Sequence, residues 1–254
     1  MTPPVDALPR WEWLGPDDAD VRVAGHSHML TLRESMDRLG PERRRVAVLD
    51  VAEAPVVPTD SYWDTVVADD RPVVVVWGGN EHAVVFMLSD EPITIVGPRA
   101  EVPDTPRRVI PYTMVKSLWR IWLTPLAQFL ERHPSPGAVT LLGTPPPKPE
   151  DRIRAGIAVE PHFVALLGEQ GLTPDTAPVV ATATRVASWN ALQDTIHEIA
   201  LEGGASFLPV PDDIASADGT LRPELCSPDA THANADYGHR MWRHLLEQYA
   251  GDGS

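Results

Sequence analysis

Residues 21–32 read VRVAGHSHMLTL. The segment 21–25 is a short run with two valines, typical of a buried strand. From residue 29 the pattern changes, because apolar side chains recur at helical spacing as far as residue 39: Leu30, Leu32, Met36 and Leu39. A polar turn, His26-Ser27-His28, joins the two patterns. The stretch therefore predicts a strand, a turn and a helix, the unit from which parallel sheets are built.

The same alternation continues along the chain. Four further apolar runs lie at 45–51, 72–77, 138–143 and 205–210, and helical patterns at 112–133, 183–202 and 235–249. Pro125 should bend or interrupt the first of these helices. The segments 89–111 and 144–150 look irregular. Strands that alternate with helices predict an α/β fold, a three-layer α/β/α sandwich around a mainly parallel five-stranded sheet.

The length of the chain, 254 residues, is ordinary for one α/β domain, although two small domains would also fit. We expect a single domain over 1–254, with a helical insertion around 107–135. That insertion separates the third and fourth predicted strands.

Charge and cysteine content narrow the range of partners. The 36 acidic and 21 basic residues give a formal net charge of −15, which disfavours nucleic acid and anionic membrane surfaces. The first 16 residues lack the basic start and apolar run of a signal peptide, so we expect a cytoplasmic protein with no membrane segment. One cysteine, Cys226, allows no intramolecular disulfide and is more typical of a small apolar filler than of a nucleophile.

Polar residues follow several predicted strands, at the edge where open α/β sheets bind ligands. Ser27 follows the first strand, and the loop after the fifth contains Asp229 and His232. A serine becomes a useful nucleophile when a base takes its proton and an acid orients that base. Ser27, His232 and Asp229 are the candidates for these three roles.

Three short blocks in this order resemble the SGNH (GDSL-like) hydrolase family. They are Gly25-His26-Ser27, Gly78-Gly79-Asn80-Glu81 and Asp229-Ala230-Thr231-His232, which stand where that family has Gly-Asp-Ser, Gly-x-Asn-Asp and Asp-x-x-His. The resemblance implies a flavodoxin-like sheet, Ser27 as nucleophile, and an oxyanion hole made by the Ser27 N–H and the Asn80 side chain. It implies no metal and no cofactor.

The chain departs from the family pattern in two places. His26 replaces the usual aspartate, which in the family supports the serine turn and is not the triad acid. The glycine that gives a further oxyanion N–H after the second strand has no evident match in residues 51–64. The resemblance thus leaves one oxyanion donor unassigned.

These residues predict a serine ester hydrolase that acts on an acyl or acetyl ester of a small molecule or glycan through an acyl-enzyme on Ser27. An intracellular O-acyltransferase with the same triad remains an alternative, because sequence does not show whether water or another alcohol takes the acyl group. A non-catalytic protein of the same fold that binds a glycan or metabolite is another, motivated by the altered first block and the missing glycine.

The remaining polar and aromatic residues admit two readings. His26, His28 and His82 could gather with His232 around a divalent metal, although no carboxylate-rich ligand set accompanies them. The pair Trp119 and Trp122 is most simply core packing, but it could also cap the site and stack on a sugar ring or accept an acyl chain. Predicted substrate contacts are His26, His28, Gly79, His82, Trp119 and Trp122.

Overall fold

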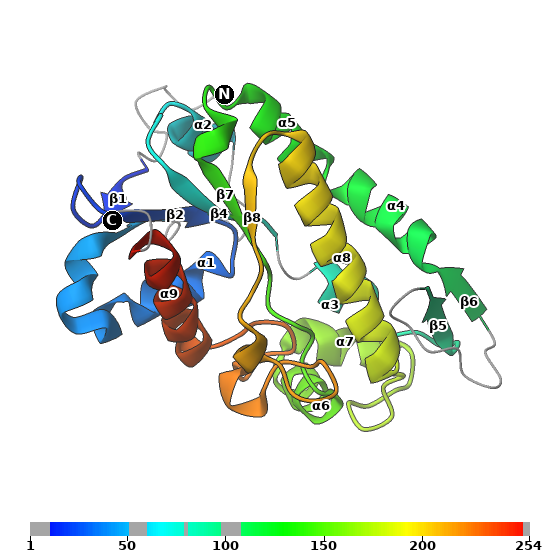
Figure 1. Cartoon of the computed structure of the whole chain (residues 1–254). Helices are drawn as coiled ribbons and strands as arrows, with labels where there is room; N and C mark the ends of the chain where they lie inside the picture. The colour runs from blue at the N-terminus through cyan, green and yellow to red at the C-terminus, as the bar shows by residue number, and fades with distance from the viewer. Residues whose placement is uncertain (1–10, 51–59, 79–80, 98–107, 251–254) are drawn as a thin grey trace, which may run out of the picture.

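The structure of the protein, a computed structural model, describes residues 11–50, 60–78, 81–97 and 108–250 (Figure 1). Within these ranges a six-stranded sheet has the order β1-β3-β2-β4-β7-β8. The strands are β1 (Trp13–Leu14), β2 (Val21–Gly25), β3 (Val46–Leu49), β4 (Val73–Val76), β7 (Val139–Leu142) and β8 (Ser206–Leu208). Only β1 is antiparallel to its neighbour. The predicted α/β fold with a mainly parallel sheet is confirmed.

The five predicted runs correspond to the five parallel strands. β2 matches its run fully, and each of the other four is one or two residues shorter than predicted at each end. Buried strands of this kind carry apolar residues on both faces, and every residue of β2, β3 and β4 is buried. The strand β1 was not predicted, because two residues are too few to show a period.

The order of the strands fixes where a ligand crevice can form. The chain passes from β2 to β3 on one side of it, then returns to place β4 on the other side. A sheet that changes direction in this way opens a crevice at the carboxyl ends of the two strands that flank the switch, here β2 and β4. The turn 26–28 leaves β2 at that edge, and Trp77 and Gly78 follow β4 there.

Helices cover both faces of the sheet. Tyr249 of α9 (Ala235–Ala250) donates a hydrogen bond to Thr140 of β7, over 3.1 Å. On the next strand, Phe207 stacks on His197 of α8 (Thr182–Glu202) with ring centroids 5.0 Å apart. Thr140 and Phe207 point to opposite faces, since Phe207 is paired with Leu141 and side chains alternate along a strand. Helices α8 and α9 therefore lie on opposite sides (Figure 1).

The helix after the serine turn, α1 (Met29–Ser35), packs closely on α9. A Cβ on Gly238 would stand 2.0 Å from the Thr31 carbonyl oxygen, so only glycine permits this approach. The indole of Trp242 donates to the Leu32 carbonyl oxygen over 2.8 Å. Beyond Ser35 the predicted helix continues as the 3₁₀ segment η2 (Met36–Arg45). Contacts with α9 thus fix the position of α1, the helix that follows the serine turn.

The predicted helices at 183–202 and 235–249 are confirmed by α8 and α9. The pattern at 112–133 forms two helices, α4 (Tyr112–Trp122) and α5 (Thr124–Arg132), with Pro125 in the first turn of α5, where its missing N–H costs nothing. The remaining helical segments are α2 (Asp60–Val67), α3 (Glu81–Val85), α6 (Glu150–Val159), α7 (Pro161–Glu169), η3 (Pro136–Ala138), η4 (Asp212–Ile214) and η5 (Pro223–Leu225).

The expectation that 89–111 is irregular was wrong. Two strands, β5 (Ile93–Val96) and β6 (Arg108–Pro111), pair in parallel as a separate small sheet beside the start of α4 (Figure 1). Residues 144–149 are irregular as expected. No helix in the described ranges is both long and apolar enough to span a membrane.

Candidate active site

The serine turn is tied to the end of β4 by His26. Its backbone N–H donates to the Val76 carbonyl oxygen over 2.9 Å, and its ring Nδ1 accepts the Gly78 N–H over 3.0 Å. Burial lowers the pKa of His26 to about 4, so near neutral pH the ring is neutral and able to accept this bond. His26 thus joins the two loops that flank the crevice, a structural task compatible with the place of the family's aspartate.

Asp229 and His232 form a close pair. Asp229 Oδ1 accepts the backbone N–H groups of Thr231 and His232, over 2.8 and 2.6 Å, and Oδ2 lies 3.3 Å from His232 Nδ1. Oδ2 also accepts the Ser227 hydroxyl over 2.6 Å. Burial by itself raises the pKa of Asp229, but the hydrogen bonds from His232, Ser227 and Thr231 outweigh it and hold that pKa far below its ordinary value. The carboxylate is therefore ionised and faces the imidazole.

The imidazole of His232 stands beside the serine turn. Its ring centroid is 5.3 Å from that of His28, the residue after Ser27. Ser27 and His232 are both partly exposed, whereas His28 is buried with 2% of its surface accessible. The structure therefore brings the Asp229–His232 pair, about 200 residues away in the chain, to the edge where Ser27 leaves β2.

A buried lysine that the sequence analysis missed anchors the loop around Asp229. The side chain of Lys148 is 1% exposed, and its ammonium donates to the carbonyl oxygens of Ser227 and Asp229 over 2.8 and 2.6 Å. It also stands 3.5 Å from Asp229 Oδ1. Burial lowers the pKa of Lys148, and the nearby Asp229 carboxylate opposes part of that shift. Lys148 therefore positions the loop that carries Asp229, the candidate triad acid.

Helix α6 also contacts the loop around Asp229. A Cβ on Gly156 would stand 2.3 Å from the backbone nitrogen of Ala230, so the helix touches the loop backbone directly. The carboxylate of Glu160, at the end of α6, accepts the Ala230 N–H over 2.6 Å. Lys148 and α6 thus both hold the backbone of the loop that carries the Asp229 carboxylate.

In a serine esterase whose acid is Asp229, replacing Lys148 by Met should lower kcat for an ester substrate by about 100-fold and leave KM nearly unchanged, the scale expected when a catalytic group moves by about 1 Å. The change removes the donor that two loop carbonyls share and leaves them without a partner. Steady-state kinetics with a p-nitrophenyl ester measure both constants.

The matched control is Lys116→Met, because the chain has only these two lysines and Lys116 pairs on the surface with Glu198. An equal decrease in kcat in the two variants, or a change in KM alone, would show that Lys148 does not act through Asp229.

The other predicted site residues are placed as follows. Gly79 and Asn80 lie outside the described residues, as do 51–59, where the unassigned oxyanion donor was sought. His82 is 1% exposed, and burial, with smaller contributions from His28 and Arg185, lowers its pKa to about 3. Trp119 is fully buried, and its indole donates to the Ser188 carbonyl oxygen over 3.1 Å.

Trp122, in contrast to Trp119, is 51% exposed and lines a pocket next to the serine turn. The pocket has a volume of about 290 Å³. Its aromatic walls are His26, Trp63, Trp77, Trp122 and Phe129, and its polar side chains include Asp60, Glu81, Gln128 and Arg132. The two tryptophans of the sequence stripe therefore have different surroundings, one in the core and one at an open surface.

A metal site and a cysteine nucleophile are the two other chemistries that the sequence raises. No group of three His, Cys, Asp or Glu side chains in the described ranges is arranged to hold a metal ion. Burial raises the pKa of Cys226 to about 11, so near neutral pH its thiol is protonated and a weak nucleophile.

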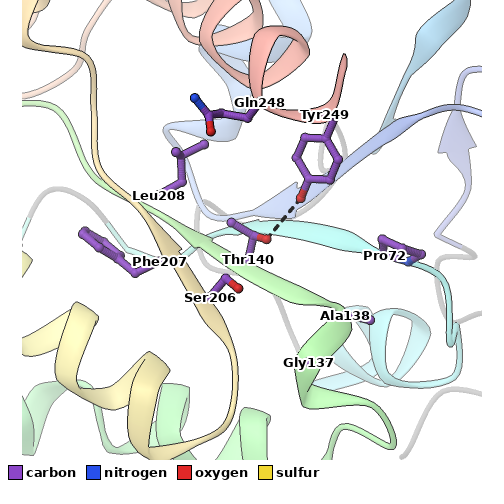
Figure 2. A pocket seen from close by; sticks show the side chains of 9 residues that line it. All are labelled: Pro72, Gly137, Ala138, Thr140, Ser206, Phe207, Leu208, Gln248 and Tyr249. Carbon is purple, nitrogen blue, oxygen red and sulfur yellow. Dashed lines mark hydrogen bonds between the residues drawn. The ribbon is translucent and has the colours of Figure 1, made fainter. Parts of the chain in front are cut away.

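A larger cavity lies at the opposite end of the sheet (Figure 2). Its volume is about 430 Å³, and Pro72, Ala138 and Ser206, which precede or begin β4, β7 and β8, contribute to its lining. Figure 2 shows Tyr249 reaching Thr140 across it. None of the candidate residues lines this cavity, and ligands of open α/β sheets bind at the other end of the strands.

Comparisons with models of protein families and with curated proteins find no match to this chain. The resemblance to the SGNH family therefore rests on the three sequence blocks. Of their residues, Ser27, Asp229 and His232 are among those that the structure describes.

Proposed function

We propose that the protein is an SGNH-type serine esterase, a three-layer α/β/α sandwich that cleaves an acyl or acetyl ester through an acyl-enzyme on Ser27. The observation that carries the proposal is the Asp229–His232 pair, 3.3 Å apart, beside the serine turn at the topological switch point. A charged acid, an imidazole and a serine hydroxyl at one edge are the parts that acyl transfer to serine needs.

The roles follow from the geometry of the pair. Because Nδ1 of His232 faces the ionised Asp229, Nε2 is the nitrogen that takes the Ser27 proton. The Ser27 oxygen then attacks the acyl carbon, and the imidazolium returns the proton to the leaving alcohol oxygen. In the second half of the reaction, water gives a proton to His232, attacks the acyl-enzyme and releases the acid, and Ser27 regains its proton. In an acyltransferase a second alcohol would take the place of water, with the same residues in the same roles.

Within the described part of the serine turn, the Ser27 N–H is a candidate donor for the oxyanion. Among the described residues, no hydrogen bond engages the Ser27 N–H. The N–H groups of Met29 and Leu30 already donate within the turn, to His26 and Ser27. The Ser27 N–H and the side chain of Asn80 are the proposed pair of donors, by the resemblance to the family; such a donor typically contributes about 2.7–4 kcal/mol to catalysis.

Reaction with a fluorophosphonate probe tests the nucleophile without knowledge of the substrate. We expect one adduct per chain, mapped by mass spectrometry to the peptide that contains Ser27 and absent from the Ser27→Ala variant. The reason is that a fluorophosphonate labels only a serine that a neighbouring base activates. The proposal fails if wild type does not react, or if the adduct forms on another serine such as Ser227, which hydrogen-bonds to Asp229.

A further inference from the structure

The pocket next to the serine turn is placed to bind one part of an ester. His26, the residue before Ser27, belongs to its wall. The rest of the wall comes from α2, the residue after β4, the start of α3, and helices α4 and α5. A group held there therefore contacts the residue that precedes the proposed nucleophile in the chain. It lies on the side of the turn that faces Trp63 and Trp77.

The aromatic side chains give the pocket flat apolar surfaces. Trp63 and Trp77 stack with centroids 4.5 Å apart and an interplanar angle of 27°, and His26 packs against both. Each of these tryptophans is at least 92% buried, so their positions are fixed by the core. Trp122, half exposed, presents its indole at the surface. A flat ring face of this kind binds the apolar C–H face of a ring-shaped ligand.

Polar side chains interrupt the apolar wall. Five of the ten lining residues carry polar groups: His26, Asp60, Glu81, Gln128 and Arg132. Neither Asp60 nor Gln128 has a hydrogen-bond or ion-pair partner among the described residues, whereas Arg132 pairs with Asp64 over 2.5 Å. Carboxylate and amide groups beside an aromatic face match a ligand with several hydroxyl groups.

The size and charge of the pocket disfavour a long acyl chain or an anion as its ligand. A volume of about 290 Å³ lies at the lower end of the roughly 300–1,000 Å³ usual for small-molecule sites. A long acyl chain would desolvate the Asp60 carboxylate without giving it a partner, which is costly. A phosphate or carboxylate ligand would meet two carboxylates and a guanidinium that is already paired.

We propose that this pocket binds a neutral sugar ring, the alcohol part of an acylated glycoside, and so presents the acyl carbonyl to Ser27. The inference rests on the proposed esterase function and names its substrate class. In the reaction the bond from the Ser27 oxygen to the acyl carbon forms and the bond from that carbon to the sugar oxygen breaks. The proton that His232 took from Ser27 passes to that sugar oxygen, which leaves as a hydroxyl group of the free sugar, and water then hydrolyses the acyl-enzyme.

Binding is measured on the Ser27→Ala protein, so that no turnover disturbs it. The probes are the methyl glycosides of glucose, galactose, mannose and N-acetylglucosamine with their mono-O-acetyl esters, and octanoate and glucose 6-phosphate as competing classes. We expect saturable quenching of tryptophan fluorescence by at least one neutral glycoside and none by octanoate or the phosphate. Trp122→Ala should weaken that binding about tenfold, or about 1.4 kcal/mol, the scale of one aromatic contact.

Ile121→Ala is the matched control, since Ile121 precedes Trp122 on α4, is 71% exposed and does not line the pocket. Its affinity for the glycoside should equal that of the parent protein. Saturation by octanoate, or no saturation by any glycoside in a protein whose wild type still reacts with the fluorophosphonate, overturns the sugar assignment and leaves the esterase standing. Glycoside binding without fluorophosphonate reaction overturns the esterase instead.

Discussion

Ser27→Ala should lower kcat for p-nitrophenyl acetate by about 10⁶-fold, the loss typical of removing the nucleophile of a serine triad. In the proposed mechanism the Ser27 oxygen is the atom that bonds to the acyl carbon, and the Cys226 thiol is a poor substitute because burial keeps it protonated. Stopped assays with esters from acetate to octanoate, on wild type and variant together, measure the loss and the chain length that the site accepts.

The control for this variant is Ser206→Ala. Ser206 lies at the start of β8, beside the cavity at the far end of the sheet, and should leave the rate unchanged (Figure 2). Turnover that survives in Ser27→Ala would assign the activity to another residue. The circular dichroism of the variant should match that of wild type, because Ser27 is partly exposed in a turn and its hydroxyl is not part of the core.

Asp229→Asn should lower kcat by roughly 10⁴-fold, as expected when the triad acid loses its charge. The two backbone N–H groups that bind Oδ1 can still be accepted by the amide oxygen. The new NH₂ group then occupies the position of Oδ2, 3.3 Å from His232 Nδ1, where it donates to the ring. An imidazole that accepts a hydrogen bond at Nδ1 carries its own proton on Nε2. Its Nε2 can therefore no longer take the proton of Ser27.

Asp218→Asn separates this effect from a general disturbance of an acidic turn. Asp218 also accepts the N–H of the residue two positions on, together with the Thr220 hydroxyl, but it is not paired with a histidine in the described structure. The variant should keep near wild-type kcat. A loss in Asp229→Asn no larger than that in Asp218→Asn would argue that the Asp229–His232 pair does not act as a catalytic dyad.

The parts of the fold that sequence predicted are those whose signal is local. Runs such as 73–76, four consecutive valines, can bury both faces only inside a parallel sheet. The helices α8 and α9 are long enough to establish a period, whereas α6 has only Ile153, Gly156 and Ile157 buried and gave no clear stripe. The strands β5 and β6 are four residues each and pair only with one another, which local pattern did not reveal.

The candidate site likewise has residues that the sequence predicted and contacts that only the structure shows. Ser27, Asp229 and His232 were identified from their order and residue types, and the structure then placed the last two next to the serine turn. The contact between Lys148 and the Asp229 carbonyl spans 81 positions of the chain, and no motif records it. The stack of Trp63 on Trp77, and the different surroundings of Trp119 and Trp122, were likewise beyond a helical-spacing argument.

Sequence alone determined the α/β class, the positions of the parallel strands and the residue types at their carboxyl ends, because hydrophobic period and turn composition are properties of neighbouring residues. Tertiary structure alone decided that Lys148 and α6 hold the loop of Asp229, that His26 links two loops, and that a tryptophan-walled pocket adjoins the serine turn. Each of these depends on which strands and helices become neighbours in space, and that arrangement is set by burying the whole core together rather than by any one segment.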